Sequence, residues 1–469
     1  MKLQLYNTET RTKQPIELDK NSTTLRMYTC GPTIYDYAHI GNFRTYIVED
    51  LLRRTLKFFG FQVSQAMNIT DIDDKTIRGA IGKNIALKEY TEPFRIAFFE
   101  DLDALNIERV EHYPAATDYI DAMIRLIQKL LDKGAAYKSQ GGSIYFSIRH
   151  FPQYGRLSHL CLDELKTNAS GDNEADEYSK DNIADFVLWK AHDPARDGSL
   201  FWNSPFGPGR PGWHIECSAM AMELLGESID IHCGGVDNMF PHHENEIAQS
   251  ECCSGHRFVR YWFHVEHLLV DHKKMSKSLG NFYTLRDILK RGYTGPELRY
   301  LLLATHYRVQ LNFTFAALDG ARAARTRIRD CVERLRELDG AAEPHEFPAL
   351  KTANGAFTAA LSDDLNTSAA LAVLFDLIRE LNVLADAGQL NAAGAAGALA
   401  LFERWDRVLG VFPLQQVSSA PAHLLALLAE REAARKAKNW KVSDTLRDEI
   451  LNAGYVIEDS PQGAKLKKK

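Results

Sequence analysis

Apolar and polar positions near the start of the chain predict a strand, a helix and a second strand in succession. Residues 24–30 (TLRMYTC) and 61–71 (FQVSQAMNITD) have the composition of short strands. Between them, apolar side chains recur at helical spacing over 43–60, which ends in a glycine. This order is a βαβ unit, which implies parallel strands and a right-handed crossover. The strand ends at Cys30–Gly31 and Thr70–Asp71 then lie at the carboxyl edge of the sheet, where open α/β sheets bind ligands.

A second α/β segment follows much later. Residues 227–235 (ESIDIHCGG) predict a strand, 236–253 a turn and a helix, and 260–270 (RYWFHVEHLLV) a further strand. The intervening residues 118–205 are less regular, and 171–186 carries six acids and one Lys, which is typical of an exposed loop. These patterns indicate one sheet domain that is split by an insertion.

Helical patterns dominate from about residue 295, with Ala-rich runs at 321–337 and 357–410. Glycines interrupt the stretch 389–405, which weakens the helix prediction there. Residues 413–421 (PLQQVSSAP) predict a linker before a last unit at 421–469. We expect the three lysines that end this unit to be disordered and to attract RNA diffusely.

Composition narrows the class of protein. The 469 residues are 45% hydrophobic and 25% charged, which excludes disorder, collagen and coiled coil as whole-chain descriptions. We find no apolar run of membrane-spanning length and no signal peptide. The net charge of −6 argues against a generic nucleic-acid coat, but residues 421–469 carry ten Lys or Arg against seven acids, a net of +3 that leaves −9 elsewhere. A local basic track for RNA is therefore compatible with an acidic total.

The seven cysteines are too sparse, and odd in number, for a secreted disulfide framework. A reducing cytoplasm is the expected location, which leaves the thiols to pack or to bind metal. The cysteines are Cys30, Cys161, Cys217, Cys233, Cys252, Cys253 and Cys331.

Residues 39–42 (HIGN) stand where the first helix begins. A helix N-terminus offers unpaired N–H groups and a partial positive charge, which suit phosphate. Gly41 permits close approach of a ligand to the backbone, and His39 and Asn42 can donate hydrogen bonds. The alternative interpretation is a surface histidine beside an asparagine cap.

Residues 274–278 (KMSKS) place two Lys and two Ser beyond a predicted strand. Lys274 and Lys277 could stabilise charge on phosphate oxygens during nucleophilic displacement, carried by a mobile loop that folds over a polyphosphate. A solvated basic loop is the alternative.

A third group of residues has the chemistry of a metal site. In FPHHENEIAQ, His242 and Glu246 are four apart, whereas His243 and Glu246 are three apart, so spacing alone leaves both pairs open. Cys30 ends the first strand, and Cys217 lies in GWHIECSAM. Zinc takes thiolate, imidazole and carboxylate ligands, although each residue taken singly could be structural.

Taken together, these segments resemble the cysteinyl-tRNA synthetase family of class I aminoacyl-tRNA synthetases. The resemblance rests on YTCGPTIYDYAHIGN, AMNITDIDDK, PGWHIECSAM, GGVDNMFPHHENEIAQSE and DHKKMSKSLGN, and further on SDDLNTSAAL and REAARKAKNWKVSDTLRDEILNAGYVIED. It covers nearly the whole chain in the expected order. Asn42 replaces the last His of the superfamily's HIGH, a variation this family accepts, and the end QGAKLKKK lacks the Trp that we expect there.

The resemblance implies an α/β fold, with a Rossmann-like parallel-sheet catalytic domain split by an insertion, then an α-helical bundle and a small C-terminal anticodon-binding domain. The implied limits are 1–117 and 206–265 for the two catalytic halves, 118–205 for the connective insertion, 266–318 for the junction that carries KMSKS, 319–412 for the bundle and 421–469 for the anticodon-binding domain.

The resemblance also implies roles for residues. Cys30, Cys217, His242 and Glu246 would hold one zinc ion per chain, whose preference for thiolate rejects serine where a shape-based pocket would discriminate only about 10²-fold or less. Trp213 and His214 would line the cysteine pocket, and Gly31, Thr70 and Asp237 would hold the amino-acid backbone. His39, Gly41, Asn42 and Lys277 would bind ATP with Mg²⁺, with Lys274 assisting catalysis.

The implied partners are L-cysteine, ATP and cysteine tRNA, contacted at its acceptor end and anticodon, with no membrane and with a monomeric chain in the cytoplasm. In the last unit, Trp440 and Tyr455 could stack on unpaired bases, although Trp440 could equally pack in a small core. Two alternatives remain: a ligase that transfers activated cysteine to a small amine, as in mycothiol biosynthesis, and a catalytically silent RNA-binding paralogue. The unit at 421–469 argues against the first, and the intact HIGN, KMSKS and proposed ligands argue against the second.

Overall fold

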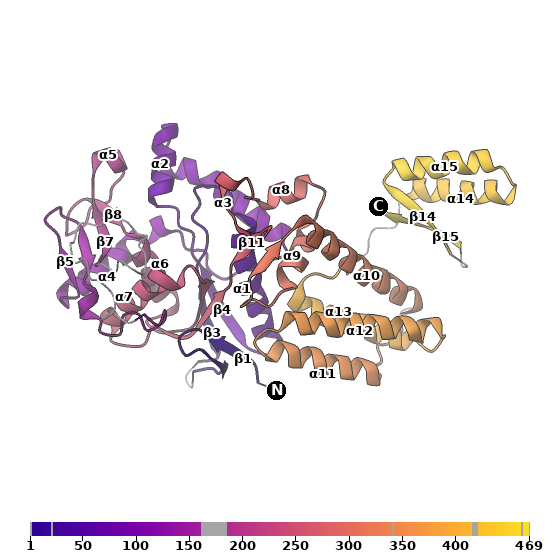
Figure 1. Cartoon of the computed structure of the whole chain (residues 1–469), viewed down its shortest axis with the longest axis horizontal. Coiled ribbons are helices and arrows are strands. Elements are labelled where there is room, and N and C mark those ends of the chain that lie inside the picture. Colours follow the sequence, from indigo (N-terminus) through magenta and orange to yellow (C-terminus); the bar gives the residue numbers. More distant parts are fainter. Residues whose placement is uncertain are drawn as a thin grey trace. The chain divides into compact units, whose positions relative to one another are not determined.

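The computed structural model describes residues 2–19, 22–160, 185–339, 342–414, 421–460 and 463–468 (Figure 1). The chain divides into two compact units, Met1–Phe412 and Pro413–Lys469. Nearly all of the predicted acidic loop at 171–186 and most of the predicted linker at 413–421 lie outside the described residues. Among the described helices, none combines the length and apolarity that crossing a bilayer requires. The finer domain limits expected from the sequence stay predictions.

A four-stranded parallel sheet lies at the centre of the first unit. Its order is β10-β9-β3-β4, and all neighbouring pairs are parallel, as the α/β prediction requires. The strands are β3 (Thr24–Thr29), β4 (Gln62–Met67), β9 (Ile229–Gly235) and β10 (Val259–Val265). Helix α1 (Ile40–Phe58) connects β3 to β4, so the predicted βαβ unit is confirmed.

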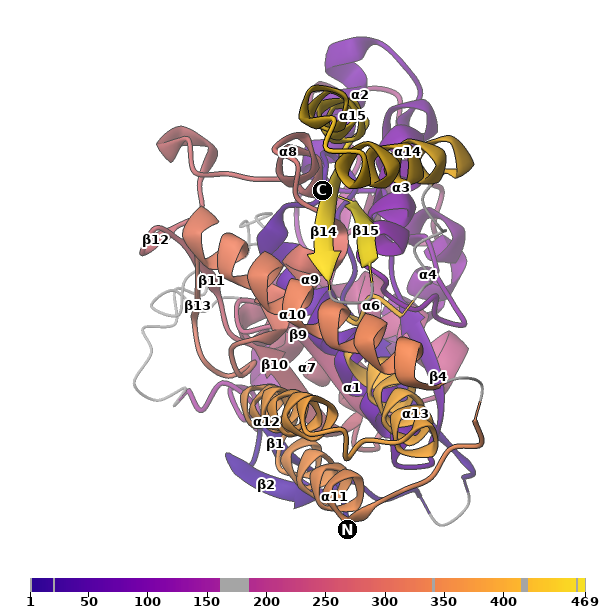
Figure 2. The same ribbon diagram turned by 90° about the vertical axis from the view of Figure 1, so that its right-hand side faces the viewer.

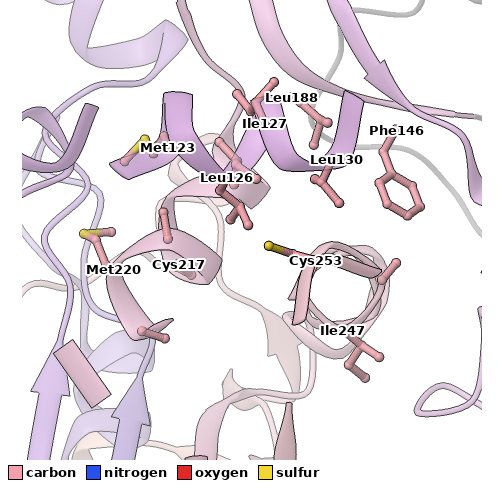
Figure 3. Close-up of a cluster of buried hydrophobic side chains, with 14 of the residues drawn as sticks. Met123, Leu126, Ile127, Leu130, Phe146, Leu188, Cys217, Met220, Ile247 and Cys253 are labelled. Carbon is pink, nitrogen blue, oxygen red and sulfur yellow. The ribbon is translucent and has the colours of Figure 1, made fainter. Parts of the chain in front are cut away.

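A hydrophobic core joins the sheet to helices α4 (Ile120–Asp132), α6 (Trp213–Leu225) and α7 (Glu244–Ser254). Figure 3 shows Cys217 and Met220 of α6 in one buried cluster with Met123 and Leu126 of α4. Because α6 and α7 are anchored in this core, the polar ends that they present to the sheet edge are held in place.

The insertion between the sheet halves contains an antiparallel sheet of order β5-β6-β7-β8. Its strands are β5 (Ala136–Lys138), β6 (Ile144–Phe146), β7 (Phe186–Ala191) and β8 (Gly209–Pro211). The other elements of the catalytic part are β1 (Gln4–Asn7), β2 (Thr12–Pro15), α2 (Asp74–Lys83), α3 (Leu87–Ala104), α5 (Pro194–Asp197), α8 (Leu285–Lys290) and α9 (Gly295–Leu303).

The prediction of one strand over 260–270 is wrong. The chain leaves the parallel sheet after Val265 and starts β11 (Leu268–Val270) in a separate sheet with β12 (Lys273–Lys274) and β13 (Leu311–Phe313). The polar pair Glu266–His267 interrupts the apolar run, and the Glu266 N–H donates to the Tyr307 carbonyl at 2.8 Å instead of to a strand of the parallel sheet. This small sheet therefore leads directly into KMSKS, whose first residue, Lys274, ends β12.

Four long helices form the predicted bundle (Figure 2). They are α10 (Phe315–Asp339), α11 (Pro348–Ser362), α12 (Thr367–Asp386) and α13 (Ala392–Leu409). Helix α13 is continuous through the glycines that weakened its prediction. A Cβ at Gly397 would lie 2.1 Å from the His345 carbonyl oxygen, so this glycine lets a neighbouring segment approach the helix closely.

The second unit consists of α14 (Ala422–Lys436), α15 (Trp440–Asn452), β14 (Tyr455–Ser460) and β15 (Gly463–Lys468). The expectation of a disordered lysine tail is wrong for residues 467 and 468, which belong to β15 and pair with Val456 and Tyr455 of β14. Antiparallel backbone pairing orders this segment despite its charge.

Candidate active site and metal centre

The four residues expected to bind metal meet at the carboxyl edge of the parallel sheet. Cys30 follows β3, Cys217 lies in the second turn of α6, His242 belongs to the irregular turn Met239–His243, and Glu246 lies in the first turn of α7. One ligand atom from each lies within 4.8 Å of the others. Residues far apart in sequence thus offer two thiols, one imidazole and one carboxylate to a common point.

The donor atoms fit a zinc ion. His242 Nε2 and Glu246 Oε1 are buried and form an ion pair at 3.0 Å, but neither atom has a hydrogen bond of good geometry among the described residues. Buried polar atoms without a well-formed hydrogen bond are costly, and a shared cation would satisfy both. Two thiols, an imidazole and a carboxylate are the ligand types that zinc prefers.

A second set of four residues also meets the geometric condition, with His232 and His243 in place of Cys217 and His242. His232 Nε2, however, lies 2.9 Å from Glu246 Oε2, and His243 Nδ1 lies 2.8 Å from His264 Nε2. Both histidines therefore have hydrogen-bond partners, and they are suited to orienting the metal ligands and not to binding the metal. Sequence reasoning missed His232 of β9 and His264 of β10, because their partners Glu246 and His243 lie on other elements.

The electrostatics of the cluster favour ionised ligands. Burial opposes ionisation of the Cys217 thiol, but the Cys30 hydrogen bond and the nearby His242 lower its pKa to about 6. Burial likewise opposes the charge of Glu246, and His232 and His242 outweigh it and bring the pKa of that carboxyl to about 2. The hydrogen bond to Cys217 and burial raise the pKa of Cys30. The two thiols thus share a proton that a metal would displace.

The residues expected to bind the amino acid surround this cluster. The Trp213 ring stacks on His242 with ring centroids 4.2 Å apart, and His214 Nδ1 lies 3.0 Å from His242 Nδ1. Both side chains therefore orient the imidazole. The exposed Asp237 follows β9, and its charge acts on His39, which brings the ammonium-binding candidate beside HIGN.

Gly31 and Thr70 are joined by a chain of hydrogen bonds that sequence reasoning missed. The Gly31 N–H donates to Asn68 Oδ1 at 2.9 Å, Asn68 Nδ2 donates to Thr70 Oγ1 at 3.1 Å, and Thr70 Oγ1 donates to Glu216 Oε2 at 3.1 Å. A Cβ on Gly31 would lie 1.8 Å from the Asn68 carbonyl oxygen, so the glycine lets the ends of β3 and β4 approach. Asn68 and Glu216 therefore hold the predicted substrate residues in place.

HIGN forms the N-terminus of α1, as predicted. His39 is the N-cap: its Nδ1 accepts from the Asn42 N–H, and Asn42 Oδ1 accepts from the His39 N–H, both at 3.1 Å. Burial lowers the pKa of His39 to about 4, against the opposing charge of Asp237, so the ring is neutral at pH 7. Because Nδ1 accepts, the hydrogen-bond network assigns the ring proton to Nε2, which can donate to a ligand.

KMSKS lies beside HIGN. A Cβ at Gly41 would lie 3.1 Å from Met275 Cε, and the Ile40 N–H donates to the Tyr283 carbonyl at 2.9 Å. Lys274 and Lys277 are exposed, and Lys277 Nζ forms an ion pair with Asp36, just upstream of HIGN. The structure thus brings Lys277 to the helix N-terminus that suits phosphate, with the exposed Lys274 on the same segment.

A parallel sheet with HIGN at its first crossover helix and KMSKS after its last strand defines the catalytic domain of a class I tRNA synthetase. The family model described as tRNA synthetases class I (C) catalytic domain matches residues 17–323. A DALR domain matches 356–413, and a cysteinyl-tRNA ligase anticodon binding domain matches 418–465.

Relatives of known function show to which family of class I tRNA synthetases the chain belongs. A cysteine–tRNA ligase from Protochlamydia amoebophila is 57% identical over 99% of this chain and 98% of its own length, and one from Chlamydia pneumoniae is 56% identical with the same coverage. The chain belongs to the cysteine–tRNA ligase family. A solved Mycobacterium tuberculosis methionyl-tRNA synthetase in complex with methionyl-adenylate shares the fold, with a TM-score of 0.60, 15% identity and coverage of 82% of this chain and 90% of that one.

Proposed function

We propose that this protein activates L-cysteine with ATP to cysteinyl-adenylate and transfers it to the 3′-terminal ribose of cysteine tRNA. The observation that carries the proposal is the meeting of a thiol-rich metal site with HIGN and KMSKS at one sheet edge. One part of the site suits the substrate's sulfur, and the other suits the phosphates of ATP.

Cys30, Cys217, His242 and Glu246 would hold one zinc ion per chain. When bound, zinc would supply a Lewis-acidic centre that prefers a thiolate to a hydroxyl, so it would select cysteine over serine. Trp213 and His214 fix the orientation of His242 through the ring stack and the 3.0 Å nitrogen contact. Asp237 meets the ammonium group, while the chain from Gly31 through Asn68 to Thr70 shapes the backbone subsite.

In the first step the cysteine carboxylate attacks the α-phosphorus of ATP and pyrophosphate leaves. His39 donates from Nε2 to a phosphate oxygen, and the Gly41 N–H lies in the first helical turn, where no carbonyl of the same helix can accept it. Asn42 keeps His39 in this tautomer. Lys277 exchanges Asp36 for the transferring phosphate, and Lys274 adds a second positive charge, with Mg²⁺ accompanying ATP.

In the second step the terminal ribose hydroxyl attacks the activated carbonyl and AMP leaves. The second unit would bind the anticodon, with Trp440 exposed over 59% of its surface as a stacking platform and Tyr455 at the start of β14 as a further candidate. This exposure favours the stacking role of Trp440 over the core alternative. We propose that the enzyme works in the cytoplasm, where its described cysteines, none of which is paired, would stay reduced, and that it works as a monomer.

Pyrophosphate exchange and tRNA charging test the proposal together. We expect cysteine-dependent exchange that collapses when a chelator removes zinc, with serine nearly inert. Charging of purified cysteine tRNA separates the synthetase from a ligase with a small amine acceptor and from a silent RNA-binding paralogue. Exchange that is indifferent to cysteine or serine would refute the role of zinc in selection, and exchange without charging would refute tRNA as the acceptor.

A further inference from the structure

The last residues of the first unit are held by side chains from three different elements. The carbonyl of Leu409 accepts from Arg299 Nε of α9 at 2.7 Å, and the carbonyl of Gly410 accepts from Asn106 Nδ2 at 3.0 Å. The carbonyl of Val411 accepts from Arg325 Nε of α10 at 2.8 Å. Three consecutive carbonyls at the end of the bundle, the first of them on the last residue of α13, are thus each bound by a donor from outside α13. We call residues 409–412 with these three donors the exit clamp.

The amides of the same segment are also bound. The N–H groups of Val411 and Phe412 both donate to Asp406 Oδ1, at 2.7 and 2.8 Å. Gly410 has φ of 64°, and a Cβ there would lie 2.8 Å from Asn106 Nδ2 and 3.0 Å from Arg299 Nε. The segment therefore fits its donors closely, and a glycine is needed both for its backbone and for the approach of Arg299.

The exit clamp is linked to the helix that begins with HIGN. Arg299 is fully buried, and its Nη2 donates to Asp50 Oδ2 of α1 at 2.5 Å. Arg54 of α1 donates to the same carboxylate oxygen at 2.8 Å. Buried charges persist only when they are paired and hydrogen-bonded, so this junction is a rigid one.

The exit clamp lies at the boundary between the two compact units of the chain. The first compact unit ends at Phe412 and the second begins at Pro413. We propose that the exit clamp positions tRNA, because it fixes, relative to the HIGN helix, the last residues of the first unit, from which the chain continues to the anticodon-binding unit. Asn106, Arg299 and Arg325 are then positioning residues for full-length tRNA and have no part in cysteine activation. This inference rests on the proposed function.

The expected consequence of opening the exit clamp concerns tRNA alone. A tRNA that binds at its anticodon and at its acceptor end must order every residue between the two sites that is free to move, and each such residue adds an entropic cost. A substrate that lacks the anticodon does not engage the second unit. Loss of the exit clamp should therefore raise the KM for full-length tRNA and leave both pyrophosphate exchange and an acceptor-stem minihelix unaffected.

The test uses the full chain with the double variant N106G/R325M. Asn106 is exposed and has φ of 53°, which glycine adopts without strain, and Met keeps the aliphatic part of Arg325. The buried Arg299 stays in place to preserve the fold. We expect the KM for cysteine tRNA to rise about tenfold, which is the cost of ordering about one freed residue, with exchange and minihelix charging within about twofold. Hydrogen exchange at the Val411 and Phe412 amides should accelerate.

A matched control is N84G/R327M. Asn84 also has φ of 53°, at the end of α2, and Arg327 lies on α10 over the Phe375 ring, a contact that the exit clamp does not use. This variant should behave as the unmodified protein. Equal losses in exchange, minihelix charging and tRNA charging would overturn the inference, as would an unchanged KM for tRNA or unchanged protection of the two amides. Failure of the unmodified protein to charge tRNA would instead refute the proposed function.

Discussion

The metal cluster and the KMSKS segment lie at the same sheet edge but are built in opposite ways. Glu246, His242 and Cys217 are buried to 1% exposure or less and come from elements anchored in the core. Lys277 is 60% exposed on a short segment, and its ion partner Asp36 is also partly exposed. The difference follows from the chemistry, because selecting a sulfur atom needs a dry and rigid site, whereas stabilising a transferring phosphate needs cations that can move.

Replacing a buried metal ligand is expected to have the largest effect on activity, and it tests the buried side of this comparison. Replacing Cys217 with Ser offers a hard hydroxyl where zinc prefers a thiolate. We expect kcat/KM for cysteine-dependent exchange to fall more than about 10³-fold, beyond the 10–100-fold typical of partners that only support a metal ligand. Metal content and exchange rates measure the effect. Cys252→Ser, at a half-buried cysteine on α7 outside the cluster, is the control, and normal exchange by the Cys217 variant would contradict the assignment.

Replacing Lys277 with Ala tests the exposed side. We expect kcat for adenylation to fall about 10²- to 10³-fold, as for loss of one group that stabilises transition-state charge, while cysteine binding is mostly retained. Single-turnover adenylate formation and equilibrium cysteine binding measure the two effects. Lys273→Ala, at an equally exposed lysine of β12, should leave both unchanged. Loss of cysteine binding in the Lys277 variant would show that its role is misassigned.

Replacing His232 with Phe sharpens the comparison within the buried side. Phe keeps the ring stack on Trp262, whose centroid lies 4.7 Å away, but loses the contact with Glu246 Oε2. We expect zinc affinity to fall about 10–100-fold, because the carboxylate loses the partner that orients it. Competition with a chelator measures this affinity. Complete loss of metal would instead make His232 a ligand, as the second set of four residues requires.

The last effect concerns the pH dependence of stability and not catalysis. The pKa of His39 is lowered to about 4 by burial, so the unfolded chain binds this proton more readily between pH 6.5 and 4. Stability from this group is therefore complete above pH 6.5 and is lost as the pH falls toward 4, by at most about 3 kcal/mol. His39→Asn keeps an N-cap acceptor without a titrating ring. The free energies of unfolding of the two proteins, measured with denaturant, should converge over this pH range. A difference that stays constant with pH would contradict the lowered pKa of His39.

Sequence reasoning succeeded where a local pattern carries the information. The helical spacing after HIGN predicted α1 and its start at HIGN, because helix periodicity is a local property, whereas the N-cap is His39 and not the asparagine of the alternative interpretation. The strand over 260–270 was predicted wrongly because Glu266 binds a carbonyl about 40 residues away. Backbone pairing across a turn likewise orders residues 467 and 468, which charge alone would leave disordered.

The candidate site shows the same division. Cys30, Cys217, His242 and Glu246 could be named from their residue types and from the family resemblance, and the structure brings them together. Asn68, Glu216 and His264 could not, because their value lies in hydrogen bonds to residues on other elements. Asn and Glu beside a glycine and a threonine carry no distinctive sequence signal.

The sequence by itself determined the order of the elements, the position of the phosphate-binding helix end and the chemistry of the metal ligands. These depend on periodicity, capping and residue type, which are local properties. Only the tertiary structure decided which histidines support the ligands and which lysines face HIGN. It also decided where the chain is clamped before the second unit. These depend on contacts between residues far apart in sequence, which form only when the sheet edge, the insertion and the bundle have folded together.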